Sequence, residues 1–205
     1  MRHRIERSLI LLSVLVLAGA TTIQGRAAET SKASGAKKLS SPATLITKNS
    51  VGPIRLGMSV AQARKAVPKL KFARTTDGEG MALIEVKGGE TADMVLYAGE
   101  DDAEGPIHEN AKIQLIKVFG QAYKTANGVH PGMPLREVEK KYGKLTNISM
   151  SEIESREYAE FARQPAGLLF QVGLPEIGIA GKYPEGKRET AVYVPSAVVT
   201  NIEIY

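Results

Sequence analysis

A Gly-Met pair occurs twice in similar surroundings, and this repeat constrains the fold more than any other feature of the chain. The segments "GPIRLGM" (52–58) and "GVHPGM" (128–133) each lead directly into a helical pattern of polar and apolar residues. The two patterns, "SVAQARKAV" and "PLREVEKKY", start 75 residues apart, at Ser59 and Pro134. Two similar segments at this separation predict that one structural unit occurs twice.

The first pattern predicts a short helix with clear start and stop signals. Ser59 and Gln62 form a capping-box pattern, in which each side chain bonds the backbone N–H of the other. Pro68 ends the helix because it cannot donate the next backbone hydrogen bond. Apolar residues recur between these signals at spacings of three and four, which places them on one face: Val60, Ala63, Ala66 and Val67.

The second pattern predicts an equivalent helix. Pro134 suits its first turn, and Gly143 is placed to end it. Glu137 and Lys141 predict an ion pair four residues apart on the exposed side. The apolar face consists of Leu135, Val138 and Tyr142.

The match continues into segments that have the composition of strands. "DMVLYAG" (93–99) aligns with "GLLFQVG" (167–173) at an offset of 74, and "AKIQLIKVF" (111–119) aligns with "AVVTNIEIY" (197–205) at an offset of 86. "MALIEVK" (81–87) also matches "EYAEFAR" (157–163). The change of offset places an insertion of about twelve residues in the second copy, within 174–196.

These patterns predict an α+β fold class. We expect two tandem repeats, each with one helix packed on a small antiparallel sheet of about three strands. The predicted divisions are a signal peptide over 1–20, a flexible linker over 21–49, repeat 1 over 50–125 and repeat 2 over 126–205. The sheet face opposite each helix, or the groove between the units, is where we expect a partner to bind.

The first residues have the order of an export signal. A basic lead, "MRHRIERS", precedes the apolar run "LILLSVLVL" and the small residues "AGA". Cleavage falls between Ala20 and Ala28, and the alternative is an uncleaved N-terminal anchor. The run is shorter than the ~20 apolar residues that a membrane span needs. We therefore expect an exported protein, periplasmic or secreted, without a stable membrane anchor after cleavage.

Composition excludes several classes of function. The chain has no Cys, which excludes disulfides, thiol catalysis, thiolate metal sites and a lipid anchor on cysteine. Without residues 1–20, Lys plus Arg number 24 and Asp plus Glu number 21, so the net charge is +3. This ordinary charge and the absence of Trp disfavour nucleic-acid binding. The motifs of metal sites, nucleotide loops and nucleophilic hydrolases are absent, so we expect no cofactor, no metal and no enzyme activity.

The repeat resembles that of two protein families. "IRLGMSVAQARKAVPKL" and "VHPGMPLREVEKKYGK" are similar to the repeat shared by the beta-lactamase inhibitory protein and the small lipoproteins of the outer-membrane barrel-assembly machinery. The resemblance covers about 155 residues, from Val51 to Tyr205, with a motif of about 15 residues in each copy. It implies an exported module that binds another protein. This chain lacks the Cys of both families and the aromatic-rich sheet of the inhibitor, so their specific partners do not carry over.

The acidic loop "GEDDAEG" (99–105) is the first candidate binding site. Glu100, Asp101, Asp102 and Glu104 place four carboxylates within five residues. Carboxylates are ligands for hard cations such as calcium, although the EF-hand spacing is missing. The alternatives are a loop that faces a basic partner and a solvated hairpin tip.

The insertion within 174–196 is the second candidate. Tyr183 and Tyr193 are separated by basic residues that include Lys187 and Arg188. Tyr and Arg are enriched at the centres of protein interfaces, and long loops often carry function. The alternative is an ordinary long hairpin.

The sequence therefore predicts an exported protein-binding module that resembles an inhibitor and acts without catalysis. Its partner is another envelope or secreted protein, bound through a sheet face or the inserted loop. An assembly factor or chaperone-like protein of the cell envelope is the alternative, and a small hydrolase is less favoured.

Overall fold

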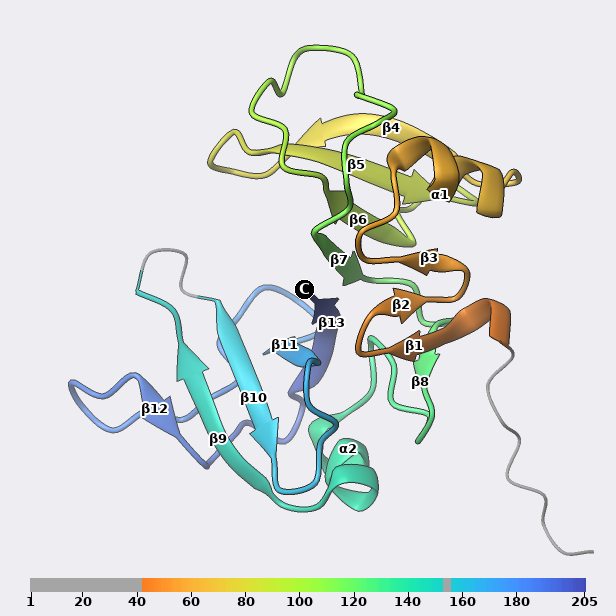
Figure 1. Cartoon of the computed structure of the whole chain (residues 1–205). Helices are drawn as coiled ribbons and strands as arrows, with labels where there is room; N and C mark the ends of the chain where they lie inside the picture. Colours follow the sequence, from red (N-terminus) through yellow and green to blue (C-terminus); the bar gives the residue numbers. More distant parts are fainter. Residues whose placement is uncertain (1–41, 153–155) are drawn as a thin grey trace, which may run out of the picture. The chain divides into compact units, whose positions relative to one another are not determined.

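The computed structural model describes residues 42–152 and 156–205 (Figure 1). The predicted signal peptide and most of the predicted linker lie outside the described residues. In chain order, the elements are η1 (Pro42–Thr44), β1 (Leu45–Thr47), β2 (Ser50–Val51), β3 (Ile54–Arg55), α1 (Val60–Ala66), β4 (Lys71–Thr76), β5 (Ala82–Lys87), β6 (Met94–Tyr97), β7 (Leu115–Val118), β8 (Lys124–Thr125), α2 (Leu135–Tyr142), β9 (Leu145–Met150), β10 (Glu157–Phe161), β11 (Leu169–Gly173), β12 (Glu189–Thr190) and β13 (Val198–Ile204).

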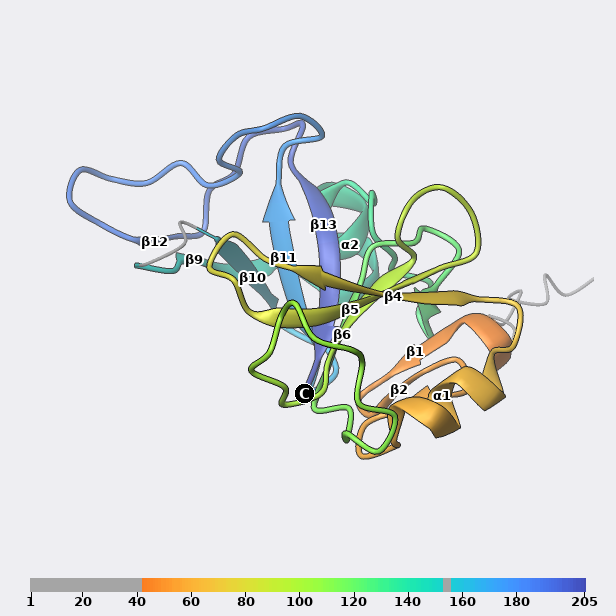
Figure 2. The same cartoon turned by 90° about the horizontal axis from the view of Figure 1, so that it is seen from above.

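Strands from both halves of the chain form one nine-stranded sheet, which we call the large sheet. Its order is β12-β9-β10-β11-β13-β7-β6-β5-β4, and every neighbouring pair is antiparallel. The halves meet where β7 pairs with β13, with Val118 opposite Ile202 and Ile116 opposite Ile204. In Figure 2, β4 and β5 cross the direction of β11 and β13, so the sheet is strongly twisted.

This arrangement corrects the predicted fold class. Strands hold 37% of the described residues and helices 11%, so the protein is mostly β. The helices do not lie on two separate small sheets, because β7 and β13 join the strands of both halves. The prediction also missed the strand that follows each helix, β4 and β9. Their sequences, "KFARTT" and "LTNISM", are rich in polar residues and lack the apolar runs used to find the other strands.

The small sheet has four strands, in the order β3-β2-β1-β8. β1 is antiparallel to β2 but parallel to β8, with Leu45 opposite Lys124. Ile46 is buried in the core. Residues 45–47 therefore belong to the globular part, although composition places them at the end of the linker.

The predicted start of α1 is confirmed. Ser59 Oγ accepts a hydrogen bond from Gln62 N at 3.2 Å, and Gln62 Oε1 accepts one from Ser59 N at 2.9 Å. These two bonds form the complete capping box. Val60 and Ala63 are buried, as their spacing predicts.

The predicted end and apolar face of α2 are also confirmed. Leu135, Val138 and Tyr142 are buried, and the helix ends at Gly143 with φ 81°. The predicted ion pair is wrong in its partner. Glu137 contacts Lys140, three residues on, at 2.7 Å instead of Lys141.

The two Gly-Met segments make the same three backbone hydrogen bonds to the core. Gly57 N donates to Ile113 O, Ile113 N donates to Met58 O and Val60 N donates to Ala111 O. In the second half, the equivalent bonds join Gly132 N to Val199 O, Val199 N to Met133 O, and Leu135 N to Ala197 O. Gly57 and Gly132 have φ of 78° and 82°, a conformation that only glycine adopts readily. The likeness of the two halves thus lies in how each helix start is attached to a strand.

The core packs α2 onto the large sheet through aromatic rings. The Tyr142 ring lies 5.7 Å from that of Phe170 on β11, and Phe170 lies 5.9 Å from Phe161 on β10. All three residues are buried. The Tyr142 hydroxyl donates to Thr125 Oγ1 at 2.7 Å, so α2 is also bonded to the small sheet.

We predict that Phe170→Ala strongly destabilises the protein. Its side chain is fully buried between two aromatic neighbours, and such truncations cost about 3–5 kcal/mol. Urea unfolding at neutral pH measures the loss. Phe119→Ala is the control, because Phe119 is 37% exposed and should lose less than about 1 kcal/mol. Equal losses for the two variants would contradict this account of the core.

Candidate functional site

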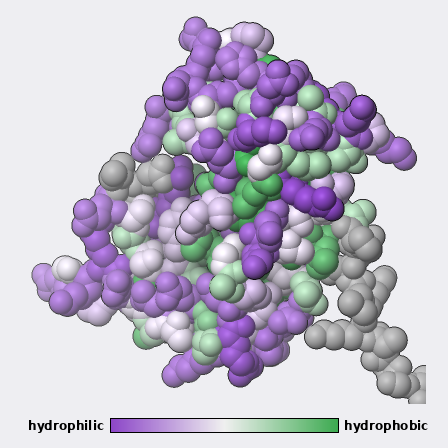
Figure 3. Space-filling model, viewed as in Figure 1, coloured by the Kyte–Doolittle hydropathy of each residue, from purple (hydrophilic) through white to green (hydrophobic). Residues whose placement is uncertain are grey.

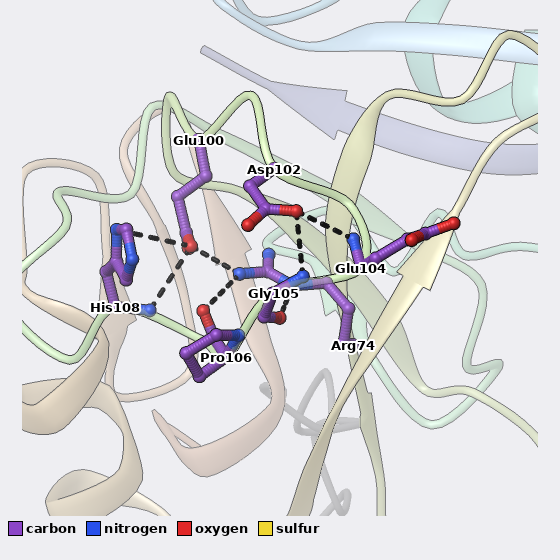
Figure 4. A network of polar contacts seen from close by, with 7 residues as sticks. All are labelled: Arg74, Glu100, Asp102, Glu104, Gly105, Pro106 and His108. Carbon is purple, nitrogen blue, oxygen red and sulfur yellow. Dashed lines mark hydrogen bonds and ion pairs between the residues drawn. The ribbon is translucent and has the colours of Figure 1, made fainter.

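The acidic loop is fastened to the large sheet by an arginine (Figure 4). Arg74 on β4 makes a short ion pair with Glu100 through Nη2, and the same atom donates to Pro106 O at 2.9 Å. Arg74 Nε donates to Gly105 O at 3.3 Å. The backbone N–H of His108 also donates to Glu100, at 3.2 Å. Glu100 is buried, so its charge acts inside the protein and not toward a ligand.

The environment of Glu100 lowers its pKa. Burial alone would raise the pKa, but the hydrogen bonds from Arg74 and His108 outweigh that effect and hold it below its ordinary value of 4.5. Asp102 accepts from the backbone N–H groups of Glu104 and Gly105 and so shapes the turn. Asp101 is exposed. Within residues 42–152 and 156–205, no group of three or more acidic or His side chains is arranged to hold a metal.

The insertion is held by a buried carboxylate on β10. Glu157, 3% exposed, accepts from the backbone N–H groups of Ala180 and Gly181 and from the Tyr183 hydroxyl at 2.8 Å. Burial and the nearby carboxylate raise the pKa of Tyr183 far above its ordinary value. The Tyr183 ring packs onto Gly181, where an added Cβ would come within 2.7 Å of the ring. Tyr183 therefore anchors the insertion to the sheet.

The second tyrosine of the insertion has the same role. The Tyr193 hydroxyl donates to Glu139 on α2 at 2.8 Å. Burial and that carboxylate raise the pKa of Tyr193 to about 12. Lys187 and Arg188 are exposed beside β12, which lies in the long blue loop of Figure 1. The structure thus brings each predicted tyrosine to an internal acidic partner and leaves the predicted basic residues at the surface.

One face of the large sheet is only partly covered by the described residues, and we call it the open face. Residues alternate between the two faces of a strand, and those opposite the core are half-buried along β5, β6 and β7. Directly paired residues share a face, which gives one continuous row across six strands. The row consists of Ala73, Glu85, Val95, Lys117, Glu203 and Leu169.

A groove adjoins this face where the insertion begins. Two neighbouring cavities of about 390 Å³ each share Phe119, Leu174 and Thr200 in their walls. Gln171 and Asn201 form part of the floor and are hydrogen-bonded to each other at 2.9 Å. Figure 3 views the molecule from the side opposite to the end of β11, where the insertion begins, so this groove is not visible in it; on the viewed side, hydrophobic residues lie near the middle with hydrophilic residues around them.

An apolar loop stands beside the groove. Leu174 N donates to Gly178 O at 3.4 Å, which closes the loop "LPEIG" and projects Ile177 outward. Ile177 is fully exposed, and Ile179 is 52% exposed. Both line the groove together with Phe119. Water-exposed large aliphatic side chains grouped in this way mark interaction surfaces.

A β-bulge shapes the floor of the groove. The register of β11 with β13 shifts between Gln171 and Val172, which leaves Thr200 without an opposite residue. Thr200 Oγ1 and Asn201 Oδ1 are buried atoms without a hydrogen-bond partner among the described residues. Asn201 is 3% exposed. A buried polar atom without a partner costs free energy, so these two atoms lower the stability of the unbound protein.

The sequence located the insertion, but the tyrosines predicted to contact a partner are not its exposed apolar residues. Tyr183 and Tyr193 have hydroxyls that can bond internal carboxylates, so their rings lie against the core. The signal for the exposed loop was present in "PEIG", where an isoleucine stands between two turn-forming residues. The floor at Thr200 and Asn201 depends on a register shift, which the residue pattern does not show.

Comparisons with known proteins identify a structural neighbour of this chain. No protein-family profile and no curated protein matches this chain. The chain is similar to a crystal structure of the uncharacterized protein YfeY from Escherichia coli, with 17% identity and a TM-score of 0.53. The match covers 78% of this chain and 99% of that chain, and at this identity it shows the fold alone. The resemblance to the beta-lactamase inhibitor and the barrel-assembly lipoproteins stays a prediction.

We predict that Glu100→Gln removes an acid-sensitive part of the stability. Because the folded protein lowers the Glu100 pKa, the ionised group stabilises the fold above pH 4.5, and this contribution is lost as the pH falls through the lowered value. The difference in unfolding free energy between wild type and variant should thus be larger at about pH 7 than at about pH 3. Urea unfolding at both pH values measures it, and a difference that grows in acid would contradict the assignment. Glu104→Gln, at an exposed position, should change stability at neutral pH by less than about 0.5 kcal/mol.

We also predict that Tyr183→Phe loosens the insertion. The change removes a hydroxyl donor from the buried Glu157 carboxylate, and such bonds to charged groups contribute about 1.5–3 kcal/mol. Hydrogen exchange of the Ala180 and Gly181 amides should become faster in the variant. Tyr205→Phe is the matched control, because Tyr205 is 68% exposed. Unchanged stability and exchange in Tyr183→Phe would show that Tyr183 is not an anchor.

Proposed function

We propose that this protein is an exported, non-catalytic module that binds another protein through the groove beside the 174–179 loop. The observation that carries the proposal is the fully exposed Ile177, which lines a groove together with Phe119 and Ile179. The occupant is a polypeptide segment of an envelope or secreted protein that presents an apolar side chain to these residues.

The apolar side chains in the lining supply the driving force for this binding. Ile177, Ile179 and Phe119 expose large apolar surfaces, and covering them removes area from water at about 25 cal/mol per Å². The hydrogen bond that closes the loop limits the backbone conformations of residues 174–178 before binding. A loop whose backbone is already restricted loses less entropy on association.

The mixed lining of the groove favours a polypeptide over a purely apolar ligand. Arg156 and Glu176 line it together with Phe119, Ile177 and Ile179. Protein interfaces combine apolar and polar groups in this way.

Export is part of the proposal and depends on the signal-like order of residues 1–20, which lie outside the described residues. None of the described helices has the length and apolar character needed to cross a bilayer. An assembly factor or chaperone-like protein of the envelope would use the same kind of surface as an inhibitor. The identity of the captured partner separates these alternatives.

Crosslinking tests the proposal in two steps. A photoreactive amino acid at position 177 of the full chain should join one envelope protein in the native cells, while the same label at Met81 should not. Met81 is the matched position, because it is also a large apolar residue and is 44% exposed.

Binding of the purified partner then gives the decisive measurement. Ile177→Ser and Phe119→Ser should each weaken binding by about ten-fold or more, which is the range of interface hot spots. Met81→Ser should leave the affinity unchanged. Wild-type affinity in Ile177→Ser, or equal crosslinking from position 81, would contradict the proposed surface.

A further inference from the structure

The edge strand β4 differs from the other sheet edges in length. In the part of the chain that the structure describes, the two sheets end at β3, β8, β12 and β4. The first three have two residues each, whereas β4 has six. Short edge strands are one way in which proteins prevent pairing with other chains. The edges at β3, β8 and β12 are therefore protected by their short length, and the edge at β4 is not.

The outer side of β4 has free backbone groups. β4 pairs with β5 over six consecutive residues without a register shift, so no bulge turns the edge away. It contains no Pro. Among the described residues, the only backbone hydrogen bonds of β4 are those to β5. About half of the N–H and C=O groups of an antiparallel edge strand point outward, and these can template a further strand.

The surface that leads to this edge is basic. Residues 59–76 contain Arg64, Lys65, Lys69, Lys71 and Arg74 and no acidic residue. Arg64 pairs with Glu109 at 2.9 Å, and Arg74 pairs with Glu100. The three lysines are exposed and form no ion pair with a described residue, and we call them the edge lysines.

A shallow cavity lies beside the segment that leads from α1 into β4. It has a volume of about 610 Å³ and is lined by Ala61, Gln62, Arg64, Lys65, Pro68 and Leu70. Leu70 directly precedes β4, and Arg64 lies over the ring of Phe72, 4.8 Å from its centroid. A chain that paired with β4 could therefore continue over this cavity past Lys69 and Lys65.

We propose that β4 and the edge lysines form a second binding surface, which takes an acidic polypeptide segment in extended conformation as an added strand. We infer a polypeptide ligand from the unpaired edge, because only another backbone offers donors and acceptors at strand spacing. We infer acidic side chains on that ligand from the positive charge of the edge lysines. A second copy of this chain fits less well, because two edges of equal positive charge would repel each other. This surface is independent of the groove at Ile177.

Binding of defined peptides tests the proposal on the full chain. The probe is a fluorescent peptide of about seven alternating Glu and Val residues, long enough to span β4. We expect saturable binding that weakens with salt, together with slower hydrogen exchange of amides within residues 71–76. A peptide in which Pro replaces each Val has the same charge but lacks half of the N–H donors, and it should not bind. Equal binding of the two peptides would overturn the added strand.

Charge reversal of matched lysines provides the second test. The combined variant Lys65→Glu, Lys69→Glu, Lys71→Glu should weaken binding of the Glu-Val peptide by about ten-fold or more. The control is Lys140→Glu, Lys141→Glu, Lys144→Glu, which changes the net charge equally at exposed positions around the end of α2. Equal loss in both variants would show that overall charge, not this edge, binds the peptide.

Two further results would overturn the proposal in favour of other occupants. Vesicles that contain phosphatidylglycerol could bind through the edge lysines while the peptide does not, which would identify a membrane surface. Alternatively, the β4 amides could already be protected in a dimer seen by sedimentation, which would identify a second copy of the chain.

Discussion

The antiparallel pairing of β7 with β13 is the contact on which the rest of the structure depends. It joins Ile116 and Val118 to Ile204 and Ile202, all of which are buried. On the opposite face, Lys117 and Glu203 form an ion pair at 3.0 Å across the same junction. The junction turns two sets of strands into one sheet, and the core therefore extends across both halves of the chain. Neither half has a complete core without the other strand of this pair.

The acidic loop and the insertion, which are the two binding sites predicted from the sequence, lie in equivalent connections of the large sheet. The acidic loop joins β6 to β7, and the insertion joins β11 to β13. Each connection is fixed by a buried glutamate, Glu100 in the first half and Glu157 in the second. Glu100 pairs with an arginine, whereas Glu157 is satisfied by backbone N–H groups and a tyrosine hydroxyl. Buried carboxylates need such partners, and meeting that need holds each loop in one position.

The insertion begins with an exposed apolar loop and is attached to the rest of the structure beyond that loop. Tyr183 and Tyr193 attach it at two points, to β10 and to α2. The loop that carries Ile177 lies before these attachments and is closed by its own backbone bond. It does not fold back onto the core, and its isoleucines remain available beside the groove. The proposed partner would cover this apolar area.

Local signals in the sequence were sufficient for the helices and for six strands, β5, β6, β7, β10, β11 and β13. The capping box at Ser59, the terminal Gly143 and the apolar faces of both helices act between residues a few positions apart, so the sequence alone determined them. Among the strands that the sequence did not predict, the two longest, β4 and β9, are stabilised by pairing with β5 and β10 and not by their own composition. The candidate site was likewise predicted only in part. The insertion was visible as a change of offset, but the roles of its residues were not.

Only the tertiary structure decided which side chains of the insertion face solvent. A tyrosine in a loop can contact a partner or bond an internal carboxylate, and the choice depends on where Glu139 and Glu157 lie in space. The tertiary structure also decided that the strands of both halves share one sheet, since sheet pairing forms between residues distant in the chain. The sequence determined the repeated Gly-Met segment before each helix. The tertiary contacts then left one long edge and one apolar loop uncovered by the described residues.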